Sequence, residues 1–149
     1  MAEGRVTDAD LAELIELVAE ATSAFIRGDM RRHVALIKHT DDYTLMSPTG
    51  GDTTHGFAMS DDRLTEMERF FKGGDATLGV VQTYASGDLA VLVVVERQHG
   101  EVGDYPAQVV AAGDSGVRRE GSEWRLAHRH AEALVHPITF DQLAELARG

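Results

Sequence analysis

The sequence has 149 residues, of which 43% are hydrophobic and 26% are charged, as is typical of one soluble globular domain. Its formal net charge of −11 at pH 7 makes nucleic acids and anionic membrane surfaces poor partners, because like charges repel. The chain contains no cysteine, which excludes a disulfide framework, thiolate catalysis, zinc fingers and iron–sulfur ligation.

The first half of the chain has the periodicity of amphipathic helices. Over residues 8–27 the apolar side chains recur every three, four or seven positions. Thr7 can cap the start of this helix, and Gly28 can provide a left-handed stop. The elements predicted in this half are a helix over 8–27, a short helix over 29–39, a strand over 42–47, a loop over 49–56 and a helix from 60 to the glycines at 73–74.

From residue 76 onward the hydrophobic pattern has a period of two, which indicates strands. The predicted strands cover residues 76–85, 89–99, about 105–112 and 123–135, and a final helix covers 140–147. The segment from Gly113 to Gly116 is rich in poor strand formers, so we expect a bulge, a bend or a loop there. Helices followed by a run of strands predict an α+β domain, in which the helices cover one face of an antiparallel sheet.

The N-terminal segment is acidic and polar, whereas a secretion signal begins with basic and then apolar residues. The longest apolar run, residues 89–95, is far shorter than the roughly 20 residues of a membrane-spanning helix. We therefore expect a cytoplasmic protein that does not associate with membranes.

Two stretches near the ends of the chain carry a resemblance to a known superfamily. The residues Phe-Ile-Arg-Gly-Asp at 25–29, Ala-Leu at 35–36 and Asp-Asp-Tyr-Thr-Leu-Met-Ser-Pro at 41–48 resemble the opening of nuclear transport factor 2-like domains. The residues Trp-Arg-Leu-Ala-His-Arg-His at 124–130 are similar to the last strand of the SnoaL-like and ketosteroid-isomerase-like branches of that superfamily.

This resemblance implies a single SnoaL-like domain over residues 1–149, with the helix at 140–147 as a C-terminal extension. It also implies a cone-shaped fold in which N-terminal helices pack on a curved antiparallel sheet around an internal pocket, and a homodimer formed through the sheet. The reaction stays open, because the superfamily includes isomerases, cyclases, dehydratases, transport factors and assembly domains.

Two positions argue against ketosteroid isomerase activity. The resemblance places the carboxylate base of that enzyme directly before the proline that follows the first strand, where this sequence has Ser47. A serine hydroxyl without an activating base cannot take up the substrate proton. The tyrosine that stabilises the oxyanion in that enzyme corresponds to Ala21, whose side chain has no donor.

Alternation along the predicted last strand separates its side chains into two sets. The bulky set suits sheet-on-sheet packing in a dimer and consists of Trp124, Leu126, His128 and His130. The two histidines would need further ligands, such as His99 or Glu132, to hold a divalent ion, so we expect no metal and no cofactor. The opposite set, with Ala127, Arg129 and Ala131, leaves space for helix packing or for a cavity.

Arg129 is the candidate anchor for an anionic or carbonyl group of a ligand in a largely apolar pocket. Strand parity lets Glu96 face the same way, so the alternatives are a structural ion pair with Glu96 or a surface position of Arg129. Tyr43 is either a hydroxyl donor in the pocket or a half-buried aromatic residue, and Met46 is the fourth pocket candidate.

Three functions are compatible with the sequence. The leading hypothesis is a domain that binds a small apolar or anionic molecule in an internal, largely apolar pocket. The first alternative is an isomerase, cyclase or dehydratase that uses a histidine or carboxylate at another position. The second alternative is an interaction module that dimerises and has a filled core. Turnover of a substrate separates the first two functions, and a cavity too small for a ligand would favour the third.

Overall fold

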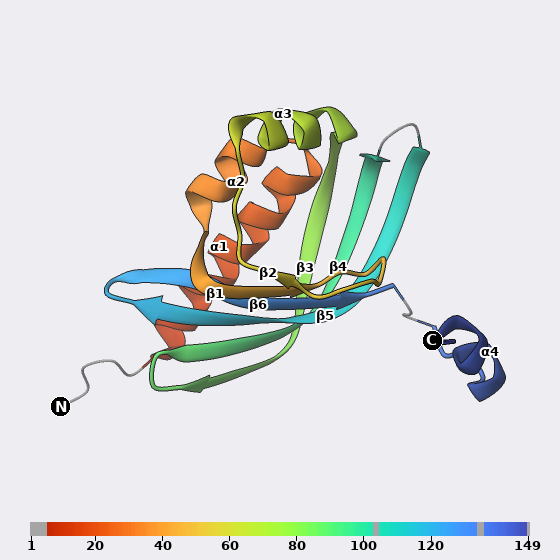
Figure 1. Ribbon diagram of the computed structural model, residues 1–149. Coiled ribbons are helices and arrows are strands. Elements are labelled where there is room, and N and C mark those ends of the chain that lie inside the picture. The colour runs from red at the N-terminus through yellow and green to blue at the C-terminus, as the bar shows by residue number, and fades with distance from the viewer. Residues whose placement is uncertain (1–5, 103–104, 134–135, 149) are drawn as a thin grey trace.

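The computed structural model describes residues 6–102, 105–133 and 136–148. Within these residues the chain forms four helices and a six-stranded sheet (Figure 1). The helices are α1 (Asp8–Ile26), α2 (Met30–Leu36), α3 (Asp61–Phe70) and α4 (Phe140–Leu146). The strands are β1 (Lys38–Met46), β2 (Thr54–His55), β3 (Phe71–Ser86), β4 (Leu89–Val102), β5 (Tyr105–Glu120) and β6 (Glu123–Glu132). Among the described residues, no helix has the length and apolar character needed to cross a membrane.

The architecture confirms the predicted α+β class, but the sheet is mixed rather than wholly antiparallel. The strands lie in the order β2-β1-β6-β5-β4-β3. Strands β3 to β6 form an antiparallel meander, whereas β1 runs parallel to β6. A parallel pair needs a long connection, and the chain from β2 through β5 supplies it. Figure 1 shows the long strands β3, β4 and β5 bending, so that part of each rises beside the helices.

Helix α1 begins and ends as its sequence predicts. The side chain of Thr7 accepts a hydrogen bond from the N–H of Asp10, and the carboxylate of Asp10 accepts one from the N–H of Thr7, which makes a capping box. At the other end Gly28 has a φ of 81°, and the N–H of Asp29 donates to the carbonyl of Ala24 at 2.8 Å. This left-handed glycine closes the helix and turns the chain into α2.

The apolar core lies between α1 and one face of the sheet, which we call the inner face. Its buried members are Leu14, Val18, Ala21, Ile37, Tyr43, Ala90, Leu92, Val94, Val117 and Leu126. In Figure 1 helices α1, α2 and α3 lie on the inner side, whereas α4 stands apart from the sheet. We call the opposite side of the sheet the outer face.

Several predicted boundaries are wrong where pairing between strands overrides the local pattern. Helix α2 ends at Leu36 and β1 begins at Lys38, whereas we predicted helix as far as 39. Lys38 and His39 are instead in register with β6, which holds them in extended conformation. The predicted loop over 49–56 contains the short strand β2, and β3 begins at Phe71. Residues 134–135 of the predicted last strand lie outside the described residues.

Strand β5 contains no loop between Gly113 and Gly116, because its pairing with β4 continues through both residues without a shift. Its pairing with β6 does shift between Gly116 and Val117, at the end of the segment where a bulge was one of the predicted irregularities. A Cβ at Gly113 would overlap the carbonyl oxygen of His130 on the neighbouring strand β6. Gly113 is therefore a position where two backbones approach closely, rather than a break in the strand.

We expect Gly113→Ala to lower the free energy of unfolding by about 1–3 kcal/mol, because the new Cβ forces β5 away from β6. Gly116→Ala is the matched control, since its Cβ would lie 3.7 Å from the nearest atom, which is ordinary contact. The control should change stability by less than about 0.5 kcal/mol. Urea denaturation measures both values, and equal stability of the two variants would contradict the close approach.

A bulge in β6 separates side chains that were predicted to share one face. Val117 is in register with Leu126, but Gly116 is in register with His128, so Ala127 is an extra residue in β6. Leu126 is buried in the core and Trp124 packs against it, on the inner face. The predicted common face is therefore wrong for both Trp124 and Leu126, which lie on the opposite face of the sheet from His128 and His130.

Candidate functional site

An ion pair crosses the inner face of the sheet. The Arg129 Nη2 atom on β6 lies 2.7 Å from the Glu96 Oε2 atom on β4. Arg129 is in register with Ser115 of β5, and Glu96 with Ala111 of the same strand. The pair therefore spans β5 above Gly113, which has no side chain to obstruct it. The partnership of Arg129 with Glu96, predicted from strand parity, is confirmed.

The two charged groups keep hydrogen-bonding capacity that the described residues do not use. The Glu96 side chain is 5% exposed, and its Oε2 also accepts a hydrogen bond of 3.1 Å from Gln98. Within the described part of the chain, Glu96 Oε1 has no protein partner and Arg129 donates a side-chain hydrogen bond only from Nη2. The Arg129 side chain is 29% exposed, so solvent reaches part of the pair from the arginine side.

A cluster of aromatic rings lies on the same face of the sheet as this polar pair. The ring of His39 stacks on Phe57, with centroids 3.6 Å apart and planes 5° from parallel. The edge of Tyr43 meets the His39 ring at a centroid distance of 4.5 Å. His33 on α2 lies 6.3 Å from His39, and its Nδ1 donates to the carbonyl of Ala21 at 2.7 Å. This hydrogen bond orients the imidazole and makes Nδ1 the protonated nitrogen of a neutral ring.

Burial keeps both histidines neutral at pH 7. It lowers the pKa of His39 to about 4, and the nearby His33 acts in the same direction. Burial also lowers the pKa of His33, while the hydrogen bond to Ala21 opposes this effect and the charge of Arg129 adds to it. Burial raises the pKa of Tyr43, and the charge of Arg129 opposes that rise. Arg129 is thus close enough to act electrostatically on both His33 and Tyr43.

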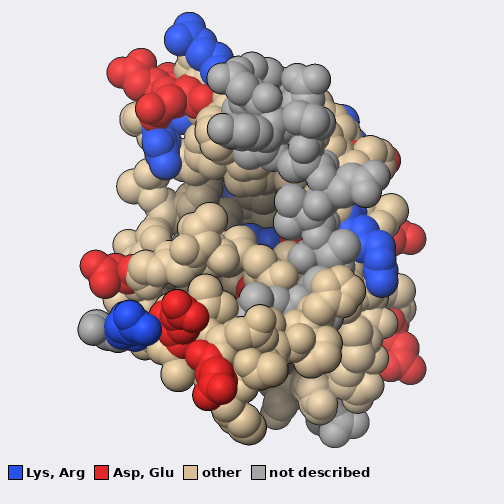
Figure 2. Space-filling model, turned by 90° about the vertical axis from the view of Figure 1, so that its right-hand side faces the viewer, with Lys and Arg blue, Asp and Glu red and all other residues tan. Residues whose placement is uncertain are grey.

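These side chains make up what we call the inner site: His33, His39, Tyr43, Phe57, Glu96, Gln98 and Arg129. The Tyr43 residue is 4% exposed, and among the described residues its hydroxyl makes no hydrogen bond. The Arg129 side chain is 29% exposed. Figure 2 shows one end of the molecule hollowed near its centre, with blue atoms of basic side chains inside the hollow. The inner site therefore combines a cluster of aromatic side chains with an ion pair whose arginine is partly exposed.

Three of the four predicted pocket residues meet at this site. Arg129, Glu96 and Tyr43 face the inner side, but Met46 is 46% exposed and is in register with His130 on the outer face. The prediction for Met46 is wrong, because the residue lies an odd number of positions along β1 from the buried Tyr43. His33, His39 and Phe57 were not predicted. They come from three separate segments, and no sequence signal links them.

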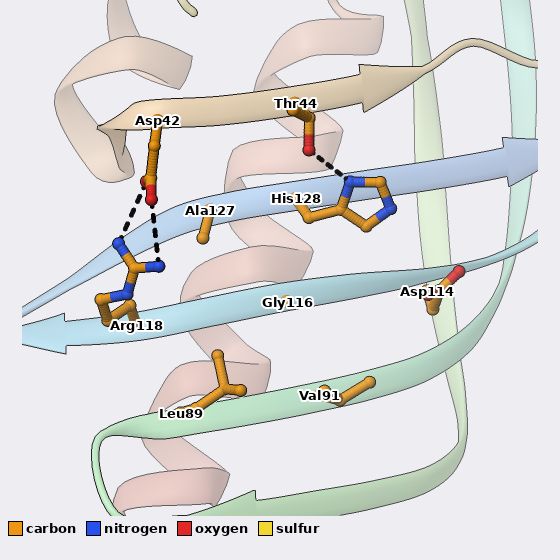
Figure 3. Close-up of a pocket in the computed structure, with 9 residues that line it drawn as sticks. All are labelled: Asp42, Thr44, Leu89, Val91, Asp114, Gly116, Arg118, Ala127 and His128. Carbon is orange, nitrogen blue, oxygen red and sulfur yellow. Dashed lines mark hydrogen bonds and ion pairs between the residues drawn. The ribbon is translucent and has the colours of Figure 1, made fainter. Parts of the chain in front are cut away.

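A groove of about 380 Å³ lies on the outer face of the sheet (Figure 3). Its lining comes from β1, β4, β5 and β6 and consists of Asp42, Thr44, Leu89, Val91, Asp114, Gly116, Arg118, Ala127 and His128. Arg118 donates two hydrogen bonds, of 3.0 and 3.3 Å, to the carboxylate of Asp42. These bonds lower the pKa of the Asp42 carboxyl group. Thr44 Oγ1 lies 2.7 Å from His128 Nδ1. The rim of the groove is polar and already paired, and its floor is small and apolar.

The outer face holds the two histidines of β6 apart from the core. His130 Nδ1 lies 3.4 Å from Asp114 Oδ1, and His128 is engaged by Thr44. In the part of the chain that the structure describes, no three His, Cys, Asp or Glu residues are grouped so that they could hold a metal ion. His128 and His130 stay candidates for a dimer face. Trp124 does not, because it packs against the core on the inner face.

Ser47 and Ala21, the two positions that argue against ketosteroid isomerase chemistry, have structural roles in a turn and in the core. Ser47 follows β1, and its hydroxyl lies 2.9 Å from the Thr49 hydroxyl within the same turn. Ala21 is 2% exposed and packs in the core. Within the described residues, neither position supplies a base or a side-chain donor to the inner site.

Comparison with known proteins shows similarity in structure alone. No protein-family model matches the sequence, and no curated protein matches it significantly. A ketosteroid isomerase-like protein from Erwinia carotovora atroseptica is 20% identical, with a TM-score of 0.63 over 88% of this chain and all of that chain (100%). A hub homology domain of CaMKII from Chlamydomonas reinhardtii is 16% identical, with a TM-score of 0.60 over 83% of this chain and 98% of that chain.

A third similar structure is an NTF2-like protein with a cystatin-like fold from Novosphingobium aromaticivorans. It is 18% identical, with a TM-score of 0.58 over 92% of this chain and 96% of that chain. The chain thus has the cone-shaped fold of nuclear transport factor 2-like proteins, as the sequence predicted. At these identities the likeness shows the fold and does not assign a reaction.

Proposed function

We propose that this protein binds a small, largely apolar molecule at the inner site. The observation that carries the proposal is the ion pair of Arg129 and Glu96, which keeps unused hydrogen-bonding atoms on the same face of the sheet as a cluster of aromatic rings. Aromatic walls with a few convergent polar groups are typical of small-molecule sites. The Tyr43 hydroxyl adds a third polar group without a partner in the described chain.

Titration of isotope-labelled protein with small aromatic amides, alcohols and ketones tests the proposal. We expect saturable chemical-shift changes at Tyr43, Glu96 and Arg129, and none in the outer groove around Thr44. Tyr43→Phe should weaken binding by about 3- to 10-fold, since it removes one hydrogen-bonding group. Tyr84→Phe, which removes a hydroxyl from a residue that is 59% exposed, is the matched control. If no probe shifts these signals at millimolar concentration, the proposal is wrong.

Catalysis of the isomerase, cyclase or dehydratase type is the alternative use of the same site. Glu96, His33 and His39 are the groups there that could move a proton, but Glu96 is held by Arg129. For a Δ5-3-ketosteroid we expect no isomerisation above background, because Ser47 and Ala21 leave the base and the oxyanion donor unfilled. An assay of absorbance at the conjugated enone product checks this expectation. Turnover within tenfold of an authentic isomerase would show that these two positions are not equivalent.

We also propose that the protein forms a homodimer through the outer face. This face carries an apolar patch, the outer patch, made of Tyr84, Leu89, Val91, Val93 and Val95. Tyr84, near the end of β3, is 59% exposed, and Leu89, the first residue of β4, is 45% exposed. Contiguous apolar surface of this kind marks an interaction site. A structural neighbour described as a hub homology domain adds support for assembly.

We expect sedimentation equilibrium at tens of micromolar to give twice the 16.2 kDa mass of the chain. Tyr84→Glu should give the monomer mass, because it would bury an unpaired charge in the proposed interface. Phe70→Glu on α3 is the matched control, since Phe70 is 52% exposed and lies away from the outer face. A wild-type protein that stays monomeric, or equal effects of the two variants, would contradict the outer face as the interface.

A further inference from the structure

The donor and the acceptor of the inner site lie side by side. Arg129 Nη2 and Glu96 Oε2 are 2.7 Å apart, and the remaining nitrogens and the remaining oxygen belong to the same two planar groups. Within the described residues, Arg129 Nε and Nη1 donate to no protein atom, and Glu96 Oε1 accepts from none. A ligand at this site therefore meets N–H donors directly beside a carboxylate acceptor.

The charge of the inner site is balanced before any ligand arrives. Glu96 neutralises Arg129, and burial lowers the pKa of both His33 and His39, so neither adds a positive charge at neutral pH. A carboxylate that approached Arg129 would stand next to the buried carboxylate of Glu96. The net charge of −11 on the chain adds a long-range repulsion. Both effects act against an anion and leave an uncharged ligand unaffected.

We propose that the inner site selects uncharged ligands that carry a hydrogen-bond acceptor next to a donor, such as a primary amide or a hydroxyketone, and discriminates against carboxylates. The carbonyl oxygen of such a group accepts from Arg129 while its N–H or O–H donates to Glu96 Oε1. The aromatic rings of His39, Phe57 and Tyr43 receive the apolar body of the ligand. This inference rests on the proposed binding function.

Benzamide and benzoate are the probes, because they share one ring and differ in the group that meets the ion pair. We expect benzamide to bind at neutral pH with a dissociation constant about tenfold or more below that of benzoate. Glu96→Gln should shift the ratio of the two constants by about tenfold toward benzoate, since it removes the like charge and leaves Arg129 unbalanced. Titrations followed by NMR give both constants for each protein.

Glu145→Gln is the matched control, because it removes the same charge from an exposed position on α4 and should leave the ratio unchanged. Equal binding of the two probes to the wild type, or tighter binding of benzoate, overturns the selectivity and leaves the binding function standing. Binding of neither probe overturns both. The wild-type ratio by itself decides the inference if Glu96→Gln does not fold.

Discussion

Arg129→Ala is expected to lower the free energy of unfolding by about 3 kcal/mol, the lower end of the range for breaking a buried ion pair. The loss is large because the Glu96 side chain is 5% exposed and would keep its charge with Gln98 as its remaining partner among the described residues. The 29% exposure of the Arg129 side chain lets water reach the vacated space, which keeps the effect from the upper end of that range. Urea denaturation at neutral pH measures it.

A double-mutant cycle shows whether the pair itself accounts for this loss. Arg129→Met with Glu96→Gln removes both charges, so the double variant should recover much of the stability that either single variant loses. Single effects that add within about 0.5 kcal/mol would mean that the two side chains do not interact. Arg63→Met with Glu66→Gln serves as the control cycle, because that pair is 2.9 Å apart but exposed. We expect its coupling to be below about 1 kcal/mol.

Acidification is expected to lower the free energy of unfolding through His39, by less than about 3 kcal/mol because the imidazole is only partly buried and solvent screens its charge. The pKa of His39 is lowered by burial from 6.5 to about 4 in the folded protein. Between these two values the unfolded chain binds the proton and the folded chain does not. Stability is therefore fully present above pH 6.5 and falls as the pH drops toward 4.

The contribution of His39 is measured against variants that keep an aromatic ring. His39→Phe preserves the stack on Phe57, and its stability should fall less than that of the wild type between pH 6.5 and 4. His55→Phe, at an exposed position on β2, is the matched control and should follow the wild-type profile. Carboxylates that titrate in the same pH range contribute equally to the stability of all three proteins, so their contribution cancels in the difference between the profiles. Parallel profiles for wild type and His39→Phe would contradict the buried neutral histidine.

The ion pair of Arg129 and Glu96 could be predicted from the alternation of side chains along two strands. Alternation along the strands over 89–99 and 123–135 was sufficient to predict that Glu96 and Arg129 face the same side. Parity holds here because Leu92, Val94 and Glu96 alternate regularly, with no irregularity in the pairing of β4 with β5. The same reasoning was wrong for Trp124, because the extra residue Ala127 reverses the faces on the two sides of the bulge.

Local sequence determined the ends of the helices and the fold class. Thr7 with Asp10, and Thr139 with Gln142, form the capping boxes that begin α1 and α4, because these bonds join residues three positions apart. The left-handed Gly28 ends α1 for an equally local reason. The change of period from helical to alternating indicated the α+β class before any contact between elements was known.

Tertiary structure alone decided the composition of the inner site. His33, His39 and Phe57 lie on α2, on β1 and in the segment before α3; the antiparallel pairing of β2 with β1 carries Phe57 back to β1, and the parallel pairing of β1 with β6 brings Arg129 to the same face. Parallel pairing is a contact between distant parts of the chain, so no local pattern encodes it. The role of Gly113 was misread for the same reason: its missing Cβ makes room for a carbonyl group of β6, which only the assembled sheet places there.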